Sequence, residues 1–155
     1  MTGWFSQAFI FGIILFIAGA GIPLMAALNA GLGVRLGNPI PAVLVLFLLA
    51  LAITAVLMLT NPLPSKAEIV AIPVHYYLGG VFVAVYVLSV TWIAPKIGLG
   101  NAIFMVLFGQ LVAAAIIDHF GLLNVPEAPI TTARIVGIGL MVIGIYLAKR
   151  PIIDM

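Results

Sequence analysis

Residues 39–60 read PIPAVLVLFLLALAITAVLMLT, a run without a single charged side chain. A helix needs about 20 apolar residues to cross the hydrocarbon core of a bilayer. Four further apolar runs of similar length lie on either side of this one, at residues 4–28, 73–93, 99–117 and 132–148. Because lipid offers no partner for backbone polar groups, such runs must fold as helices that pack together. The sequence therefore predicts an all-α membrane protein, a bundle of five transmembrane helices.

The composition is that of a membrane domain. Of the 155 residues, 65% are hydrophobic and 6% are charged, whereas soluble proteins have about 25% charged residues. The connectors between the runs are short, so we expect residues 1–155 to form a single transmembrane helical domain. The chain has no cysteine, which excludes disulfides, thiolate metal sites and cysteine nucleophiles. The six basic residues are scattered over several connectors, and this distribution predicts no nucleic-acid partner.

Basic residues are divided unevenly between the two sides of the predicted bundle. Two lie on the side of the N-terminus, and four lie on the opposite side: Lys66 and Arg134 against Arg35, Lys96, Lys149 and Arg150. The positive-inside rule weakly favours a cytoplasmic C-terminus. A bias this small also allows insertion in both orientations, and two antiparallel copies would form ten spans about a pseudo-twofold axis. We expect half of a ten-helix inverted-repeat transporter, with a single orientation as the alternative.

Small residues line one face of the last run. Gly137 and Gly144 fall on the same side of a helix as Ala133 and Ala148, because their spacings of four, seven and four fit a repeat of about 3.6 residues per turn. Small residues allow close approach between membrane helices. We expect Gly137 and Gly144 to form a dimer interface, and the alternative is packing within one chain.

The first run contains a predicted helix interruption. Pro23 lacks a backbone N–H and its ring clashes with the carbonyl four residues earlier, at Gly19. Interrupted helices often mark the substrate sites of transporters, so Gly19 and Pro23 are candidate solute contacts; the alternative is a structural proline. Asn29 ends this run, and its amide either contacts a solute or caps the helix before Gly31 and Gly33.

Gln110 is the most informative polar residue within the runs. It lies about midway along residues 99–117, where an unsatisfied amide is costly in hydrocarbon. Its partner is either a solute in a cavity or a side chain on a neighbouring helix. Asn101, near the start of the same run, is a second candidate solute contact. No charge lies deep inside any run, so a cationic solute would depend on aromatic rings such as that of Tyr86.

Titratable residues gather at the ends of three runs on one side. Asp118 and His119 end the fourth run, His75 starts the third and Arg134 starts the fifth. A carboxylate at a helix C-terminus opposes the macrodipole, so we expect a structural ion pair between Asp118 and Arg134. The alternative role is proton coupling through Asp118, His119 and His75.

The chain offers little for catalysis or cofactor binding. Two separated histidines and one aspartate make a weak metal site, and we expect neither a metal nor another cofactor. The sequence has no paired carboxylates, no nucleophile and base at a suitable spacing and no phosphate-binding loop. We therefore do not expect an enzyme.

Several short strings resemble a known family. They occur in order along the five runs: GAGIPLMAALN at 19–29, GLG at 31–33, GG at 79–80, APKIG at 94–98, GQLVA at 109–113 and DHFG at 118–121. The sequence thereby resembles the YdcZ family, small five-span proteins of the drug/metabolite transporter superfamily. The resemblance implies a multi-pass protein of the bacterial inner membrane that forms half of a ten-span transporter. Met25 departs from the family pattern, which usually has a glutamine after the proline, and this removes a polar group from the expected cavity.

These features predict a secondary transporter. We expect it to export a small metabolite or an amphipathic compound by alternating access, with proton coupling as an option. Its expected partners are the solute, the lipid bilayer and a second copy, antiparallel in orientation, or a homologous chain. The alternative is a membrane scaffold or accessory subunit that docks partner helices without transporting, or a lipid-handling protein.

Overall fold

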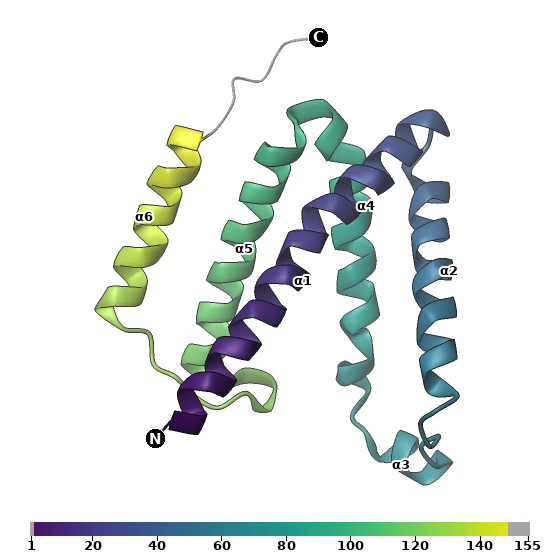
Figure 1. Cartoon of the computed structure of the whole chain (residues 1–155), viewed down its shortest axis with the longest axis horizontal. Helices are drawn as coiled ribbons and strands as arrows, with labels where there is room; N and C mark the ends of the chain where they lie inside the picture. Colours follow the sequence, from purple (N-terminus) through teal and green to yellow (C-terminus); the bar gives the residue numbers. More distant parts are fainter. Residues whose placement is uncertain (1, 149–155) are drawn as a thin grey trace. The chain divides into compact units, whose positions relative to one another are not determined.

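The computed structural model describes residues 2–148, with side chains from residue 7 onward, and this part of the chain contains helices and no strand (Figure 1). The helices are, in order, α1 (Thr2–Arg35), α2 (Pro39–Met58), α3 (Lys66–Ala71), η1 (Val74–Leu78), α4 (Gly79–Ile97), α5 (Leu99–Phe120), η2 (Leu122–Asn124) and α6 (Thr132–Ala148). The prediction of an all-helical protein is confirmed.

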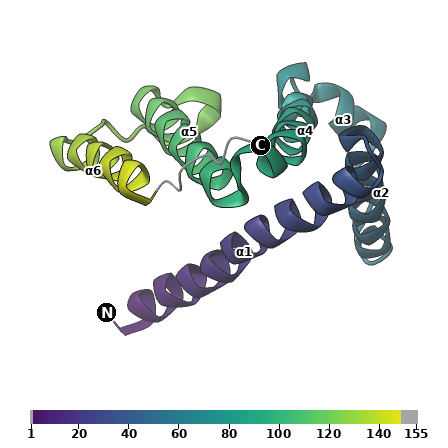
Figure 2. The same ribbon diagram turned by 90° about the horizontal axis from the view of Figure 1, so that it is seen from above.

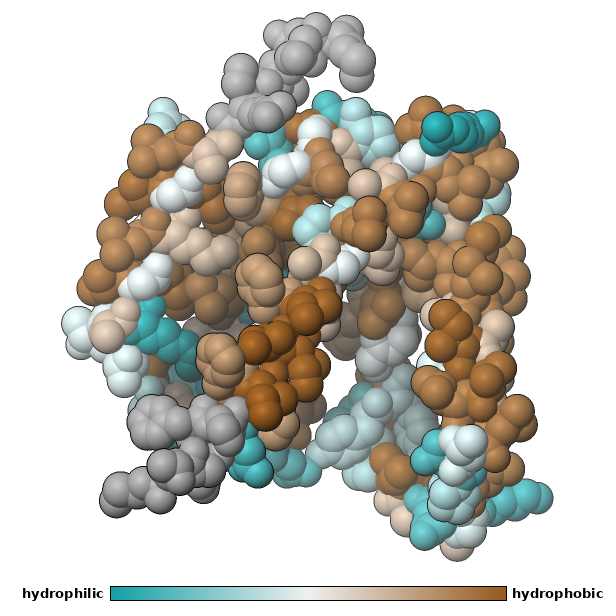
Figure 3. All heavy atoms as spheres, viewed as in Figure 1, coloured by the Kyte–Doolittle hydropathy of each residue, from teal (hydrophilic) through white to brown (hydrophobic). Residues whose placement is uncertain are grey.

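Four described segments are long and apolar enough to cross a membrane. They are Gln7–Arg35, Pro39–Met58, Val74–Ile97 and Leu99–Phe120. The last helix, α6, is also apolar but has 17 residues. Hydrophobic side chains cover most of the helix surfaces in Figure 3, and hydrophilic ones gather mainly near the helix ends. This distribution is that of helices in a lipid environment, and it confirms a membrane protein.

The chain divides into two compact units, Met1–Pro95 and Lys96–Met155. The first contains α1, α2, α3, η1 and nearly all of α4, and the second contains α5, η2 and α6. Each unit builds its own small core and its own candidate sites.

The first helix is longer than the predicted run and is not interrupted. It continues through Pro23 to Arg35 (Figure 2). The predicted break at Pro23 is therefore wrong. Membrane helices accommodate proline by small local adjustments, and Gly19 has open space around it, so the backbone can adjust there without a steric clash.

The end of α1 lies beyond the predicted one. Asn29 is one and a half turns inside the helix, so its predicted role as a cap is wrong. The chain leaves the helix at Gly37, whose φ of +67° is the left-handed conformation that glycine adopts readily. The amide of Gly37 donates to the carbonyl of Val34 at 3.1 Å, and Asn38 then caps α2 through Ile40 N–H at 2.9 Å.

Small residues form the core of the first unit. Its buried residues come from the C-terminal part of α1, the start of α2 and the C-terminal part of α4: Ala26, Asn29, Ala30, Gly33, Ala42, Val43, Val87, Val90, Thr91 and Ala94. A Cβ atom at Gly33 would lie 3.2 Å from Thr91 Cγ2 and 3.3 Å from Pro39 Cα. Gly33 therefore allows the close approach of α1 to α2 and α4, as expected where lipid provides no hydrophobic driving force between helices.

The segment between α2 and α4 contains one well-capped short helix, α3. Ser65 Oγ accepts from Glu68 N–H at 3.3 Å, and the Glu68 carboxylate accepts from Ser65 N–H at 2.7 Å. These hydrogen bonds lower the pKa of Glu68 below its usual value, and the bond from the Ser65 backbone has the larger effect. Tyr77 Oη donates to the carbonyl of Ile69 at 2.8 Å and thereby ties η1 to α3.

The second unit is a pair of antiparallel helices, α5 and α6 (Figure 1). Glycines with positive φ flank α5, with φ of +88° at Gly98 and +56° at Gly121. The half-buried residues of α6 recur every three or four positions and form one helix face: Arg134, Ile138, Met141 and Ile145.

The close contact at Gly33 generates the first prediction. Gly33→Leu should lower the free energy of unfolding by about 1–3 kcal/mol, because the added side chain overpacks a filled contact. Thermal unfolding of the purified protein in mild detergent measures this change. Gly21→Leu is the matched control on the same helix, since a Cβ there has nothing within 4 Å. Equal stability of the two variants would show that α1 does not pack through Gly33.

Candidate functional site

Asn29 and Thr91 join α1 to α4 inside the first unit. Both side chains are buried, with 5% and 3% of their surface exposed. Asn29 Nδ2 donates to Thr91 Oγ1 at 2.5 Å. Each residue lies six positions before the end of its helix, at Arg35 and Ile97 respectively, and so the two meet at the same depth. The bond uses one N–H of the amide and leaves its carbonyl oxygen and second N–H without a partner in the described chain.

A groove of about 410 Å³ opens beside Asn29 between α1 and α2; we call it the α1–α2 groove. The two helices are close at their connecting turn and diverge away from it (Figures 1 and 2). Nine residues line the groove: Met25, Leu28, Asn29, Leu32, Val45, Leu46, Leu49, Ala50 and Ile53. Asn29 is the one polar side chain among them. Met25, the position that departs from the family pattern, is part of this wall.

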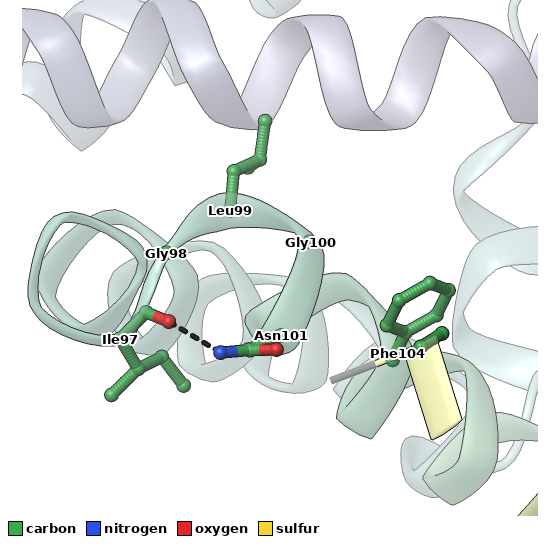
Figure 4. A pocket seen from close by; sticks show the side chains of 7 residues that line it. Ile97, Gly98, Leu99, Gly100, Asn101 and Phe104 are labelled. Atoms are coloured by element: carbon green, nitrogen blue, oxygen red, sulfur yellow. Dashed lines mark hydrogen bonds between the residues drawn. The ribbon is translucent and has the colours of Figure 1, made fainter. Parts of the chain in front are cut away.

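A second cavity, of about 490 Å³, lies at the start of α5 (Figure 4). Residues from the turn and the first helical turns line it together with the end of α6: Ile97, Gly98, Leu99, Gly100, Asn101, Phe104 and Ala148. Asn101 Nδ2 donates to the carbonyl of Ile97 at 2.7 Å. This bond satisfies the last turn of the preceding helix, so the amide of Asn101 has a structural role in the turn.

At the other end of α5, Asp118 holds the connection to α6. Its carboxylate Oδ2 lies 2.8 Å from Arg134 Nη2, in the first turn of α6. Its backbone carbonyl accepts from Ala128 N–H at 2.7 Å and from Gly121 N–H at 3.4 Å. The ion pair is about 30% exposed on both sides, and pairs of this exposure contribute about 1 kcal/mol or less. The contacts determine the path of the connection more than they stabilise the unit.

His119 contributes a second contact to the same connection. Its Nδ1 accepts from the backbone N–H of Ile130 at 3.1 Å. An imidazole nitrogen can accept only while it carries no proton, so this contact requires His119 to be unprotonated at Nδ1. We call the contacts of Asp118 and His119 with Ala128, Ile130 and Arg134 the α5–α6 clasp.

The remaining predicted solute contacts do not converge on the α1–α2 groove. Gln110 is exposed on α5, and its side chain has no hydrogen bond within residues 7–148. Gly19 is exposed and Pro23 half-buried on α1, and neither lines the cavities above. Tyr86 Oη is shielded from solvent and lacks a hydrogen-bond partner in the described chain. Gln110 and Tyr86 are thus two polar groups that need a partner.

The other predicted residues lie on outer surfaces. His75 is exposed in η1, with its ring centroid 4.3 Å from that of Tyr76. It belongs to the first unit, whereas Asp118 and His119 belong to the second. Gly137 and Gly144 are exposed on α6, and a Cβ at either would meet nothing within 4 Å. No group of three His, Asp or Glu side chains that could hold a metal occurs among the described residues.

Sequence reasoning missed the partner of Asn29 and the second wall of the groove. The predicted runs end at residues 28 and 93, so they hid that Asn29 and Thr91 lie equally far from the true helix ends at Arg35 and Ile97. The α2 wall offers no signal, because Val45, Leu49 and Ile53 are indistinguishable by type from apolar residues that face lipid.

Comparison with known proteins supports the resemblance. The family model described as "Putative inner membrane exporter, YdcZ" matches residues 10–147. No curated protein and no solved structure matches the chain. The family match covers nearly all of the described helices, from the first turns of α1 to the end of α6. The chain therefore belongs to the YdcZ family of inner-membrane exporters.

Proposed function

We propose that the protein exports a small metabolite or amphipathic compound by alternating access, as an antiparallel pair of five-span chains. The observation that carries the proposal is the family match over residues 10–147, because the family is described as an inner-membrane exporter. The apolar helices support it, since they leave no room for a soluble domain in the described chain.

The fifth span of this proposal is α6. A helix of 17 residues extends about 26 Å at 1.5 Å per residue, which is at the lower end of the lengths that cross a bilayer. With α6 included, one chain supplies five spans and an antiparallel pair supplies ten, the arrangement of many inverted-repeat transporters.

The exposed small residues of α6 support pairing through this helix. The face that packs in the second unit is that of Arg134, Ile138, Met141 and Ile145. Gly137 and Gly144 lie on an adjacent face, which remains open. A second copy can approach closely at these two positions because glycine has no side chain. A second copy or a bound solute can also supply the partners that Gln110 and Tyr86 lack.

Proton coupling through His119 extends the proposal. Protonation of Nδ1 removes the acceptor of the Ile130 N–H and places two donors against each other. The charged residues of the neighbouring elements are Asp118 beside His119 on α5, Glu127 on the connection and Arg134 on α6. In an antiparallel pair the clasp of one chain faces the periplasm, from which protons enter during antiport, and the clasp of the other chain faces the cytoplasm. Protonation would then loosen the connection between α5 and α6.

The second prediction concerns the interface on α6. Gly137→Leu and Gly144→Leu should each lower the crosslinked dimer fraction in mild detergent about fivefold or more, because a large side chain blocks close approach of the helices. Gly139→Leu is the control, since it adds the same side chain to the opposite face of the same helix, where a Cβ also has open space. A dimer fraction that falls equally in all three variants, or in none, would contradict an interface on this face.

The third prediction concerns orientation. A reporter fused to the C-terminus should give signal from both sides of the inner membrane in cells, because a bias of four basic residues against two is small. Two lysines added between Met155 and the reporter lie on the side that already has four basic residues, so they should shift the signal to the cytoplasmic side. Signal from one side only in the unmodified chain would exclude the antiparallel homodimer and leave a homologous chain as the partner.

The fourth prediction concerns the clasp. Amide hydrogen exchange of peptides from residues 121–131 should be about fivefold faster in His119→Phe than in the natural protein, because this variant lacks the acceptor of the Ile130 N–H. His119→Asn keeps an acceptor near Nδ1, so its exchange should stay as slow as that of the natural protein. Equal exchange in His119→Phe and the natural protein would show that His119 does not control the connection.

A further inference from the structure

We propose that the α1–α2 groove binds an uncharged amphipathic molecule, a compact apolar body with one hydrogen-bonding group that reaches Asn29. The inference rests on the exporter function proposed above and names the class of its substrate and the place where it binds. The natural occupant is the exported solute, not a lipid chain and not a second helix.

The walls of the groove exclude charged ligands. Eight of its nine lining residues are apolar, and none is charged or aromatic. An ion in this groove would lose its hydration without gaining a counter-charge, which is strongly unfavourable. A cation would also lack the aromatic faces that can replace a counter-charge. The groove therefore selects a neutral molecule with a largely apolar surface.

The amide of Asn29 provides the polar contact. Asn29 is buried, with 5% of its surface exposed. It is the only residue lining the groove whose side chain can form a conventional hydrogen bond. Thr91 accepts from Nδ2 and holds the amide in place. The carbonyl oxygen and the second N–H remain, so the amide can accept from a ligand N–H or O–H and can donate to a ligand oxygen. A fixed amide of this kind orients a ligand without a change in its own rotamer.

The groove is centred on the membrane-spanning part of the unit. Its lining residues on α2 run from Val45 to Ile53 and occupy the middle of the helix Pro39–Met58. A helix of 20 residues matches the thickness of the hydrocarbon core, so the middle of α2 lies near the bilayer midplane. Transporters commonly bind their substrates at this depth.

A lipid acyl chain satisfies this groove less well than an amphipathic solute. An acyl chain fills the apolar walls but leaves the free groups of the Asn29 amide without a partner, which is unfavourable in hydrocarbon. A solute with one hydrogen-bonding group fills the apolar walls and also gives the Asn29 amide a partner. The volume of about 410 Å³ also falls within the range of about 300–1,000 Å³ that is usual for small-molecule sites.

Three probes that share one aromatic body test this chemistry. N-phenyl-1-naphthylamine is neutral and has one N–H, 8-anilino-1-naphthalenesulfonate adds a negative charge, and 1-benzylnaphthalene has a methylene group in place of the N–H. Binding to the full chain in nanodiscs is measured by fluorescence after subtraction of the signal from empty nanodiscs. We expect saturable binding of the neutral amine. Both other probes should bind about tenfold more weakly, since each loses a hydrogen bond or buries a charge.

Matched variants separate the groove from the lipid and from the fold. Ala50→Phe fills the groove and should abolish saturable binding of the amine, whereas Ala55→Phe adds the same ring to the opposite face of α2 and should leave it unchanged. Asn29→Leu should weaken binding about tenfold, the loss of one ligand hydrogen bond. Thr91→Val removes the interhelical bond but keeps the Asn29 amide, so it should weaken binding less than threefold.

The outcomes distinguish this site from the exporter function. The site is overturned if the natural chain shows no saturable binding of the amine, if Ala50→Phe binds it normally, or if Thr91→Val loses as much affinity as Asn29→Leu. Efflux of the amine from proteoliposomes is measured in parallel. Normal binding without efflux would overturn the exporter function and leave the site intact. Normal efflux by Ala50→Phe would overturn the site and leave the exporter function intact.

Discussion

The close approach of α1 to α2 and α4 at Gly33 is the contact on which the first unit depends. Lipid is as apolar as the helix surfaces, so membrane helices gain little from burying large apolar side chains against each other and associate mainly through tight packing. A glycine at this point lets the backbone at the start of α2 and the side chain of Thr91 on α4 both lie close to the backbone of α1. The same contact brings Asn29 opposite Thr91 and lets α1 and α2 diverge beyond it, which opens the groove.

Polar groups are few in this chain, and their positions separate two kinds of role. The Asn29 amide lies at membrane depth in an apolar wall, where a single hydrogen-bonding group can discriminate among neutral ligands. Asp118, His119 and Arg134 lie at helix ends, where the ion pair is partly exposed and the His119 ring accepts a hydrogen bond from the backbone. Binding and proton response would thus depend on different units of the chain. An exporter driven by protons has to couple such separate events through helix movement.

Membership of the YdcZ family gives these features a common purpose. The helices of one chain leave much apolar surface and the small-residue face of α6 exposed. In a transporter of the inner membrane, such surfaces are where a second chain and lipid would lie. The open positions at Gly137 and Gly144 are suited to close contact with a helix, because glycine has no side chain to hold a partner away. The groove beside Asn29 is suited to a small molecule, because its walls diverge and enclose a polar group.

The sequence by itself determined the helical membrane class, the family and the approximate positions of the helices, because apolar length and backbone hydrogen bonding in lipid leave no other fold. It misplaced the end of α1, because Gly31 and Gly33 are as good a stop signal as Gly37 until the structure shows that the helix continues past both and that Gly33 serves a close contact. The sequence also indicated a break at Pro23, but α1 continues through this residue, because the open space at Gly19 and Gly21 lets the backbone adjust to the proline ring. Only the tertiary structure decided that Asn29 pairs with Thr91 and borders a groove. Hydrophobic residues of one type face lipid, a neighbouring helix or a cavity equally well, and the difference is made by which helices approach and where they diverge.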